Sequence, residues 1–337
     1  MNGGLHTDFI TEWDAWDRLV ECSPQGSVFS SSAWLGSLCR CTATELKGVG
    51  YFNNTDLLGG VAFSEVRRGP LRKATVPILT PYGGVLIAPT GGSRDSSVES
   101  RLHKTSVALM EFLTKHYHHV FLVHTPALHD TRPFDWGGWT VKNQYTYFVE
   151  LDSPEEIWGR FEKRTRNAVR KAEARDYRFV FEEDIEEFCR LYKKTYRKQG
   201  LPVPASPSLV RAHYMMMHER GLAFTGAVKD ASGKWVAAVL FIRNGENVCA
   251  WLSGAEPERE GEGIMSLLIW KVMESSVSKY SHFDFLGANI PSQARFKRGF
   301  GGRSVSYPLT ERYAPVWIGP LMRFARRLHI RGRKNLG

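Results

Sequence analysis

Residues 283–302 read FDFLGANIPSQARFKRGFGG, and this stretch decides the fold interpretation. Its first five residues have the apolar alternation of a strand that ends at a glycine. The remainder is a basic, aromatic and glycine-rich loop, which can present a fixed cation at the strand end. Such a cation would stabilise charge that develops during acyl transfer, or would bind a donor phosphate. A solvated basic turn remains the alternative from these residues alone.

A related pattern occurs 164 residues earlier in the chain. Residues 118–141 align with 282–305 without a gap, with six identical pairs, and the flanking elements follow in the same order. The sequence therefore predicts an internal duplication and a mixed α/β fold of two tandem lobes. We expect an N-terminal lobe at 1–142, a catalytic C-terminal lobe at 143–313 and a basic amphipathic tail at 314–337.

Hydrophobic periodicity and turn residues predict the elements of both lobes. We expect helices at about 8–20, 30–41, 95–116, 154–175, 184–199, 206–220 and 264–280, with a turn or short helix at 291–299. We expect strands at about 44–52, 57–66, 72–79, 84–88, 119–124, 145–151, 177–182, 222–229, 235–243, 247–254, 282–287 and 303–312.

The turn before the helix at 264–280 is rich in both glycine and glutamate. Gly261 and Gly263 would let backbone N–H groups approach a donor phosphate at the helix N-terminus. Four nearby glutamates would repel that phosphate, so the residues favour an ordinary helix start with acidic side chains that complement the helix dipole. On the preceding strand, backbone N–H groups near Trp251 and Ser253 are candidates for binding an oxyanion.

Three stretches carry a family resemblance: FDFLG, the FKRGFGG loop, and the basic segment FEKRTRNAVRKA at 161–172. Together they resemble the FemAB-like and BioF2-like acyltransferases of the GNAT superfamily, and the similarity covers about 27–310. The resemblance implies two GNAT-like lobes and no tightly bound cofactor. It also implies transfer of an acyl or aminoacyl group from acyl-CoA or aminoacyl-tRNA to an amine of a cell-envelope precursor, a polysaccharide or another small acceptor.

In these families the Phe-Lys pair of the loop is functionally important, which implies catalytic roles for Phe296 and Lys297. Asp284 and His282 are candidates for the base that an attacking amine requires. We expect substrate or donor contacts from Arg166, Arg170, Lys171, Trp251, Ser253, Gly261, Gly263, Arg295 and Arg298. Two departures from the family, a missing lysine after Gly36 and no coiled-coil arm, count against a peptidoglycan substrate and a tRNA donor.

The net charge of +10 favours an anionic partner. Candidates are an anionic small molecule or envelope precursor, a tRNA donor, and an anionic membrane surface, which we expect the tail at 314–337 to contact. A different function class is a non-catalytic nucleic-acid-binding protein that uses the basic helix 160–175. No helix-turn-helix, RNP or zinc-finger signature accompanies that helix.

The remaining composition predicts a cytoplasmic enzyme, located in part at the inner face of the membrane. The five cysteines form no CxxC pair, no apolar run is long enough to span a bilayer, and the N-terminus lacks a signal-peptide pattern. No P-loop, Rossmann or G-x-S-x-G motif occurs. The histidines do not have the spacing of a metal motif, so we expect no metal. They are His116, His118, His119, His124 and His129.

Overall fold

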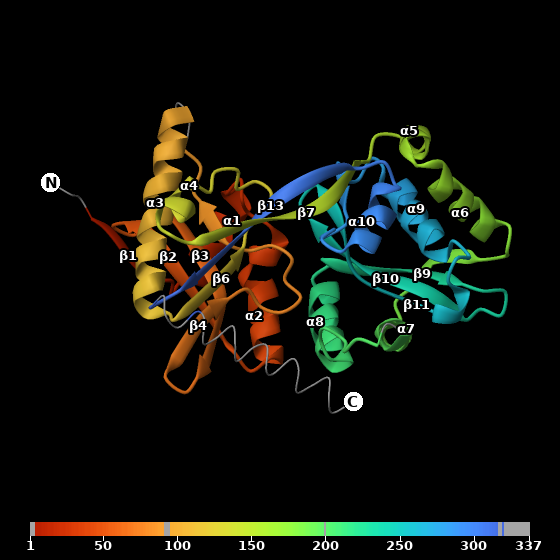
Figure 1. Ribbon diagram of the computed structural model, residues 1–337, viewed down its shortest axis with the longest axis horizontal. Helices are drawn as coiled ribbons and strands as arrows, with labels where there is room; N and C mark the ends of the chain where they lie inside the picture. Colours follow the sequence, from red (N-terminus) through yellow and green to blue (C-terminus); the bar gives the residue numbers. More distant parts are fainter. Residues whose placement is uncertain (1–3, 91–94, 199, 316–318, 320–337) are drawn as a thin grey trace. The chain divides into compact units, whose positions relative to one another are not determined.

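The computed structural model describes residues 4–90, 95–198, 200–315 and 319 (Figure 1). The chain forms two compact units: unit 1 contains residues 1–143 and 307–337, and unit 2 contains residues 144–306. Each unit has a mixed sheet with helices packed on it. In this division residues 307–313 belong to unit 1, whereas the sequence predicts them in the C-terminal lobe, and the first boundary follows residue 143 rather than 142.

Unit 1 has the strand order β1-β2-β3-β4-β6-β13, with β5 beside β3. β4 and β6 run parallel, and the other neighbouring strands run antiparallel. Its elements are β1 (Leu5–Phe9), α1 (Trp13–Cys22), η1 (Val28–Ser30), α2 (Ser32–Cys41), β2 (Glu45–Asn53), β3 (Asp56–Arg68), β4 (Leu71–Thr75), β5 (Val85–Ile87), α3 (Asp95–His116), β6 (His119–Val123), α4 (Arg132–Trp136) and the second half of β13 (Arg303–Tyr313).

Unit 2 has the strand order β7-β12-β11-β10-β9-β8, and here β11 and β12 are the parallel pair. The core includes the apolar helix α9 and both faces of the central strand β10. Its elements are β7 (Thr140–Glu150), α5 (Pro154–Arg160), α6 (Lys163–Glu173), β8 (Arg178–Phe181), α7 (Ile185–Lys198), α8 (Pro207–Glu219), β9 (Ala223–Lys229), β10 (Trp235–Asn244), β11 (Asn247–Ala255), η2 (Pro257–Arg259), α9 (Ile264–Ser276), β12 (His282–Asp284), α10 (Pro291–Arg298) and the first residues of β13.

The two units repeat one topology. In unit 1 the strands β1, β2, β3, β4, β6 and β13 follow the order in which unit 2 uses β8, β9, β10, β11, β12 and β7. The last strand of each unit comes from the other half of the chain. β7 follows α4 in sequence but pairs with β12, whereas β13 follows α10 but pairs with β6.

Burial along the strands corrects the predicted register of the repeat by one residue. Val120 and Leu122 are the buried residues of β6, and Phe283 and Phe285 are buried in unit 2, so the equivalent strands are offset by 163 residues rather than 164. Side chains alternate along a strand, so a shift of one residue exchanges the two faces of the sheet.

The predicted helix 154–175 is in fact two helices that break at Phe161. Phe161 is extended and buried, with its ring 5.1 Å from that of Phe300 and 5.4 Å from that of Trp270. The Arg166 guanidinium donates to the carbonyl oxygen of Gly159 at 3.2 Å and to that of Phe161. These contacts satisfy carbonyls at the end of α5, which a helix otherwise leaves without partners.

The N-terminal helix is shorter than expected. Of the predicted helix 8–20, residues 13–20 belong to α1, whereas residues 8 and 9 end the strand β1, which pairs with β2. The predicted membrane contact of the tail falls on residues 316–318 and 320–337, which lie outside the described residues. Within the described part of the chain, no helix combines the length and the apolar character needed to cross a bilayer.

Gly263 sets the distance between α6 and α9. It has a φ of +84°, and a Cβ atom there would lie 1.9 Å from the carbonyl oxygen of Ala168. Gly261 has a similar φ of +80°, but a Cβ atom there would meet nothing within 4 Å. Both positions strain an L-residue by about 1–2 kcal/mol, and Gly263 additionally excludes any side chain by contact.

We therefore expect Gly263→Ala to lower the melting temperature by more than Gly261→Ala does. The first substitution must push α6 away from α9, whereas the second adds only backbone strain. Thermal unfolding followed by circular dichroism measures both variants. Equal losses in the two variants would show that the contact with Ala168 relaxes without cost.

Candidate functional site

The parallel strands β11 and β12 pair over only three residues. Asn247–Cys249 lie opposite His282–Asp284, and β11 then continues to Ala255 while β12 ends. Beyond this pairing, the two strands diverge around a cavity of about 630 Å³, which we call the strand cavity. It is lined by Tyr196, Val239, Ala250, Trp251, Leu252, Ser253, Glu260, Met265, Ile269, Phe285, Leu286, Ser292, Gln293, Phe296 and Lys297.

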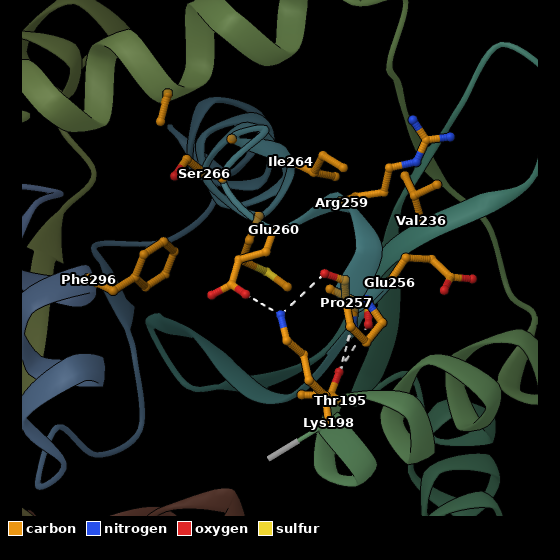
Figure 2. A pocket seen from close by; sticks show the side chains of 15 residues that line it. Thr195, Lys198, Val236, Glu256, Pro257, Arg259, Glu260, Ile264, Ser266 and Phe296 are labelled. Atoms are coloured by element: carbon orange, nitrogen blue, oxygen red, sulfur yellow. Dashed lines mark hydrogen bonds and ion pairs between the residues drawn. The ribbon is translucent and has the colours of Figure 1, made fainter.

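A second cavity of about 540 Å³, the loop cavity, lies at the N-terminus of α9 (Figure 2). It is lined by Ala168, Thr195, Lys198, Val236, Ala255, Glu256, Pro257, Arg259, Glu260, Gly261, Gly263, Ile264, Met265, Ser266 and Phe296. Glu260, Met265 and Phe296 line both cavities. The two cavities are therefore neighbours that share one wall.

A β-bulge places Trp251 at the strand cavity. Leu240 lies opposite Leu252, but Phe241 lies opposite Ala250, so Trp251 is the inserted residue. Bulges bend a strand locally and re-aim its side chains, and they occur frequently beside active sites. Beyond Cys249, β11 continues to Ala255 without a partner in β12, so its backbone groups on that side are candidates for oxyanion binding.

Lys297 lies on α10 and directs its ammonium group at the end of β12. Nζ donates to the carbonyl oxygen of Phe285 at 2.8 Å and to that of Gly287. Burial lowers the pKa of the Lys297 ammonium to about 8, and the nearby carboxylate of Asp284 offsets part of this effect. The residue is thus a positioned cation that gives up its proton more readily than an exposed lysine.

Asp284 lies behind this loop and not in a cavity wall. It is 1% exposed, and its Oδ1 accepts hydrogen bonds from Thr146 Oγ1 at 2.7 Å and from the backbone N–H of Leu286 at 2.9 Å. Leu286 has a φ of +50°, a conformation that costs energy and is often kept at functional sites. The geometry makes Asp284 a positioning residue for the loop that Lys297 contacts. The other candidate base, His282, is the first residue of β12 and lies opposite Glu150 in the ladder between β12 and β7.

Three of the four glutamates near Gly261 form ion pairs with basic side chains. The Glu256 carboxylate is bound by Lys194 at 2.7 Å and by Arg190, and these partners hold its pKa at about 2 even though burial alone would raise it. Glu262 is bound by Arg175 at 3.0 Å, and Glu260 is bound by Lys198. Ion pairing therefore weakens the expected repulsion between this loop and a phosphate.

The basic helix is α6, and several of its cations contact the protein itself. Arg166 binds carbonyls at the end of α5, the guanidinium of Arg170 lies 5.7 Å from the Trp158 ring centroid, and Lys171 donates to the Gly261 carbonyl at 2.9 Å. Among the described residues, the linings of both cavities exclude Asp284, Arg166, Arg170, Lys171, Arg295 and Arg298. Lys171 nevertheless contacts the loop that lines one of them.

The predicted residues that do meet in the strand cavity are Trp251, Ser253, Phe296 and Lys297, while Gly261 and Gly263 line the loop cavity. Sequence reasoning missed the lining residues Tyr196, Gln293 and Lys198, and gave Glu260 no role in substrate binding. Tyr196 comes from the end of α7, where burial raises the pKa of its phenol. Its sequence context carries no motif.

In unit 1, different residues occupy the positions that correspond to Lys297 and the loop after β12. At the offset of 163 residues, Lys297 corresponds to Phe134 and not to Pro133, and Gly287 corresponds to His124. His124 and Phe134 are buried with ring centroids 5.1 Å apart, and His124 Nε2 lies 2.9 Å from Thr310 Oγ1. Burial lowers the pKa of His124 to about 3, so this imidazole is neutral. Unit 1 therefore has a packed aromatic core where unit 2 has a lysine beside a cavity.

One cluster of side chains in unit 1 has the composition of a metal site. Among the described residues, Glu99, His103 and Asp130 have side-chain ligand atoms close enough to bind one ion. Arg132 lies among them, with its guanidinium 2.5 Å from a Glu99 oxygen and 2.7 Å from an Asp130 oxygen. An arginine in this position supplies the positive charge that a metal would otherwise bring.

Residues 159–298 match the family model of the acetyltransferase (GNAT) domain. Unit 2 is a GNAT domain. A comparison with curated protein sequences gives no match. The structure of FemX is similar to this chain with a TM-score of 0.64 and 12% identity, over 90% of this chain and 96% of that one.

Two other structures share the fold. A tandem GNAT protein from the clavulanic acid biosynthesis pathway has a TM-score of 0.55 and 12% identity, over 92% of this chain and 99% of that one. L-PGS from Bacillus licheniformis has a TM-score of 0.54 and 13% identity, over 92% of this chain and 96% of that one. The predicted two-lobed GNAT fold is confirmed, and it is shared with FemX, while residues 159–298 carry the acetyltransferase (GNAT) domain.

The lowered pKa of Lys297 has a measurable consequence. A titration of ¹³C-labelled lysines by NMR should show one signal with a pKa of about 8 that is missing from Lys297→Met. Between pH 8 and the ordinary lysine pKa of 10.5, Lys297 is protonated to a greater extent in the unfolded chain than in the folded protein. The free energy of unfolding of the wild type, relative to Lys297→Met, should therefore rise with pH across this window. A constant difference between the two proteins would contradict the burial of the ammonium group.

Proposed function

We propose that unit 2 transfers an acyl or aminoacyl group from a phosphate-bearing donor to an amine. The observation that carries the proposal is the shared wall of the two cavities, with Lys297 on the far side of it. A donor bound with its phosphates in the loop cavity would extend past Met265 and Phe296 into the strand cavity. Its acyl group would then lie between the bulge at Trp251 and the ammonium of Lys297.

The N-terminus of α9 supports the phosphate end of the donor. Helix N-termini attract anions through their backbone N–H groups and the helix dipole. Gly263 is the N-cap residue, and no side chain caps this end of the helix by a hydrogen bond. Lys198 and Arg259 are the cations among the described residues of the loop cavity, and both are partly exposed.

The strand cavity supports the reaction itself. Negative charge develops on the acyl oxygen when an amine attacks, and a fixed cation or N–H donor stabilises it. Lys297 is such a cation, and Tyr196, whose hydroxyl is a potential further donor, lines the same cavity. The aromatic ring of Phe296 separates the two cavities and would position the chain that links phosphate to acyl group.

We favour acyl-CoA over aminoacyl-tRNA as the donor. Acyl-CoA is the co-substrate of the GNAT fold, and a cavity of about 540 Å³ matches a small cofactor arm. Several cations on α6 already have partners in the protein, which reduces the surface available to a tRNA. The likeness to FemX and L-PGS keeps aminoacyl-tRNA as the second donor to test.

The acceptor that we propose is an amine of a cell-envelope precursor or polysaccharide. Its support is the fold shared with FemX and with the C-terminal domain of a putative lysylphosphatidylglycerol synthetase from Agrobacterium fabrum. The name of the second protein refers to a phospholipid. The non-catalytic nucleic-acid-binding alternative loses support, because Arg166 and Lys171 contact backbone carbonyls of the protein.

Native mass spectrometry of the freshly purified protein tests the donor. We expect a mass gain equal to CoA or an acyl-CoA, and we expect added acetyl-CoA to raise the melting temperature. A mass gain equal to tRNA would replace acyl-CoA by the second donor. Steeply salt-dependent binding of random-sequence RNA without any acyl transfer would instead support the nucleic-acid-binding alternative.

Lys297→Met tests the reaction. The methionine keeps most of the apolar side chain and removes the charge, so we expect normal folding and a loss of turnover of about 10²-fold or more. Lys279→Met, which removes an exposed lysine outside both cavities, is the matched control and should keep wild-type turnover. Turnover of Lys297→Met within about twofold of the wild type, under 1 kcal/mol of barrier, would move the active site elsewhere.

A further inference from the structure

Glu260 has a place in both cavities that its sequence position did not indicate. It follows η2 in the loop before α9, and its side chain is 78% exposed. Among the described residues that line the strand cavity, it carries the only carboxylate, and Lys297 carries the only ammonium group. An amine substrate is a cation in water, so a carboxylate is the group that would bind it.

Lys198, the last residue of α7, holds this carboxylate at present. Figure 2 shows its ammonium between Glu260 and Pro257, where it binds the Glu260 carboxylate and donates to the Pro257 carbonyl oxygen at 3.3 Å. The contact with Lys198 lowers the pKa of Glu260. Lys198 lines the loop cavity, whereas Glu260 lines both cavities, so the ion pair connects the proposed phosphate site to the reaction site.

The other charges around Glu260 already have partners. Glu256 is bound by Arg190 and Lys194, and Arg259 lies within 4 Å of Asp230 and Glu262. On α10, the Lys297 ammonium donates to two carbonyl oxygens. The pair of Lys198 and Glu260 is exposed, and exposed ion pairs are weak and easily exchanged.

We propose that Glu260 is the acceptor-binding residue, and that the donor phosphate releases it by taking Lys198 as its own partner. This inference rests on the proposed function of unit 2. With the donor bound, the Glu260 carboxylate turns into the strand cavity and binds the ammonium group of the acceptor. Donor binding thereby prepares the site for the amine, and an amine that arrives first finds the carboxylate occupied.

The reaction then balances as follows. Before it attacks, the acceptor ammonium gives one proton to the Glu260 carboxylate, which passes it on to solvent. The neutral nitrogen then forms a bond to the acyl carbon, and the bond from that carbon to the donor sulfur, or to the ribose oxygen of a tRNA donor, breaks. The nitrogen loses its second proton to solvent. The leaving sulfur or oxygen keeps the electron pair of the broken bond and takes a proton from solvent. Carboxylates commonly accept protons in this way when they are placed beside the attacking group.

Two amines of different charge distinguish this role from a structural one. With the donor that the wild type uses, acetyl-CoA or aminoacyl-tRNA, transfer is measured to ethanolamine and to hydroxylamine. Ethanolamine is protonated near neutral pH, and hydroxylamine is largely neutral. We expect Glu260→Gln to lose about 10²-fold in kcat/KM for ethanolamine and to keep most of its transfer to hydroxylamine. Glu258→Gln, in the same loop but outside both cavities, should match the wild type with both amines.

Calorimetric titration with the non-reacting product CoA tests the exchange of partners. Glu260→Gln should bind CoA more tightly than the wild type does, because Lys198 is free of its competitor, and Lys198→Met should bind it about tenfold more weakly. Where the wild type uses aminoacyl-tRNA, deacylated tRNA replaces CoA in this titration.

Equal losses with ethanolamine and hydroxylamine, or equal behaviour of Glu260→Gln and Glu258→Gln, would overturn this role for Glu260 while leaving Lys297 and the proposed function intact. A wild-type protein that turns over with neither donor would contradict the proposed function itself. The two failures therefore have different signatures.

Discussion

The parallel strands β11 and β12 stop pairing after three residues, so the backbone groups that follow need other hydrogen-bond partners. The candidate site of unit 2 is built around the gap between these two strands. After Asp284, the N–H groups of the chain find partners in β7 and in the side chains of Asp284 and Thr146. The carbonyls of Phe285 and Gly287 are bound by Lys297. Buried backbone groups require such partners, so the lysine completes the loop as well as charging the cavity.

This double use of Lys297 explains why the site needs a lysine rather than an arginine. A compact ammonium can donate to two carbonyls within one turn of chain and can still release a proton when it is desolvated. A guanidinium is wider and stays charged. In the equivalent part of unit 1, where no lysine is present, the buried rings of His124 and Phe134 pack together instead.

Most of the fold could be predicted from the sequence, because hydrophobic periodicity marks the elements and the repeat marks their order. The register of the repeat could not. Matching Phe121 with Phe285 gives more identities, but burial shows that Phe121 is half-buried between two core residues whereas Phe285 is itself a core residue. The break at Phe161 also escaped prediction, since the residue leaves the helix to reach partners more than a hundred positions away.

The candidate site divides in the same way. The loop with Phe296 and Lys297 is a local motif and could be found, as could the glycines before α9. Glu260 and Tyr196 are brought together by α7 packing on β11, a contact that depends on Gly254, where a Cβ atom would lie 2.5 Å from the Tyr192 nitrogen. Proximity of that kind has no signature in one sequence. The glutamates of the loop before α9 are visible in the sequence, but the basic partners of two of them lie on α7, far away in sequence, and only the structure shows these ion pairs.

The exchange of β7 and β13 has a consequence for how the chain is made. Unit 1 lacks its last strand until residues 307–313 have been synthesised, although its other strands lie within the first 123 residues. Until then β6 has an open edge, and open edges pair with other chains. Completion of the first lobe thus depends on contacts between residues almost two hundred positions apart, and contacts of such separation form slowly. A ribosome that stalls inside unit 2 would leave both lobes unfinished, so the cell never holds half of this enzyme in a finished form.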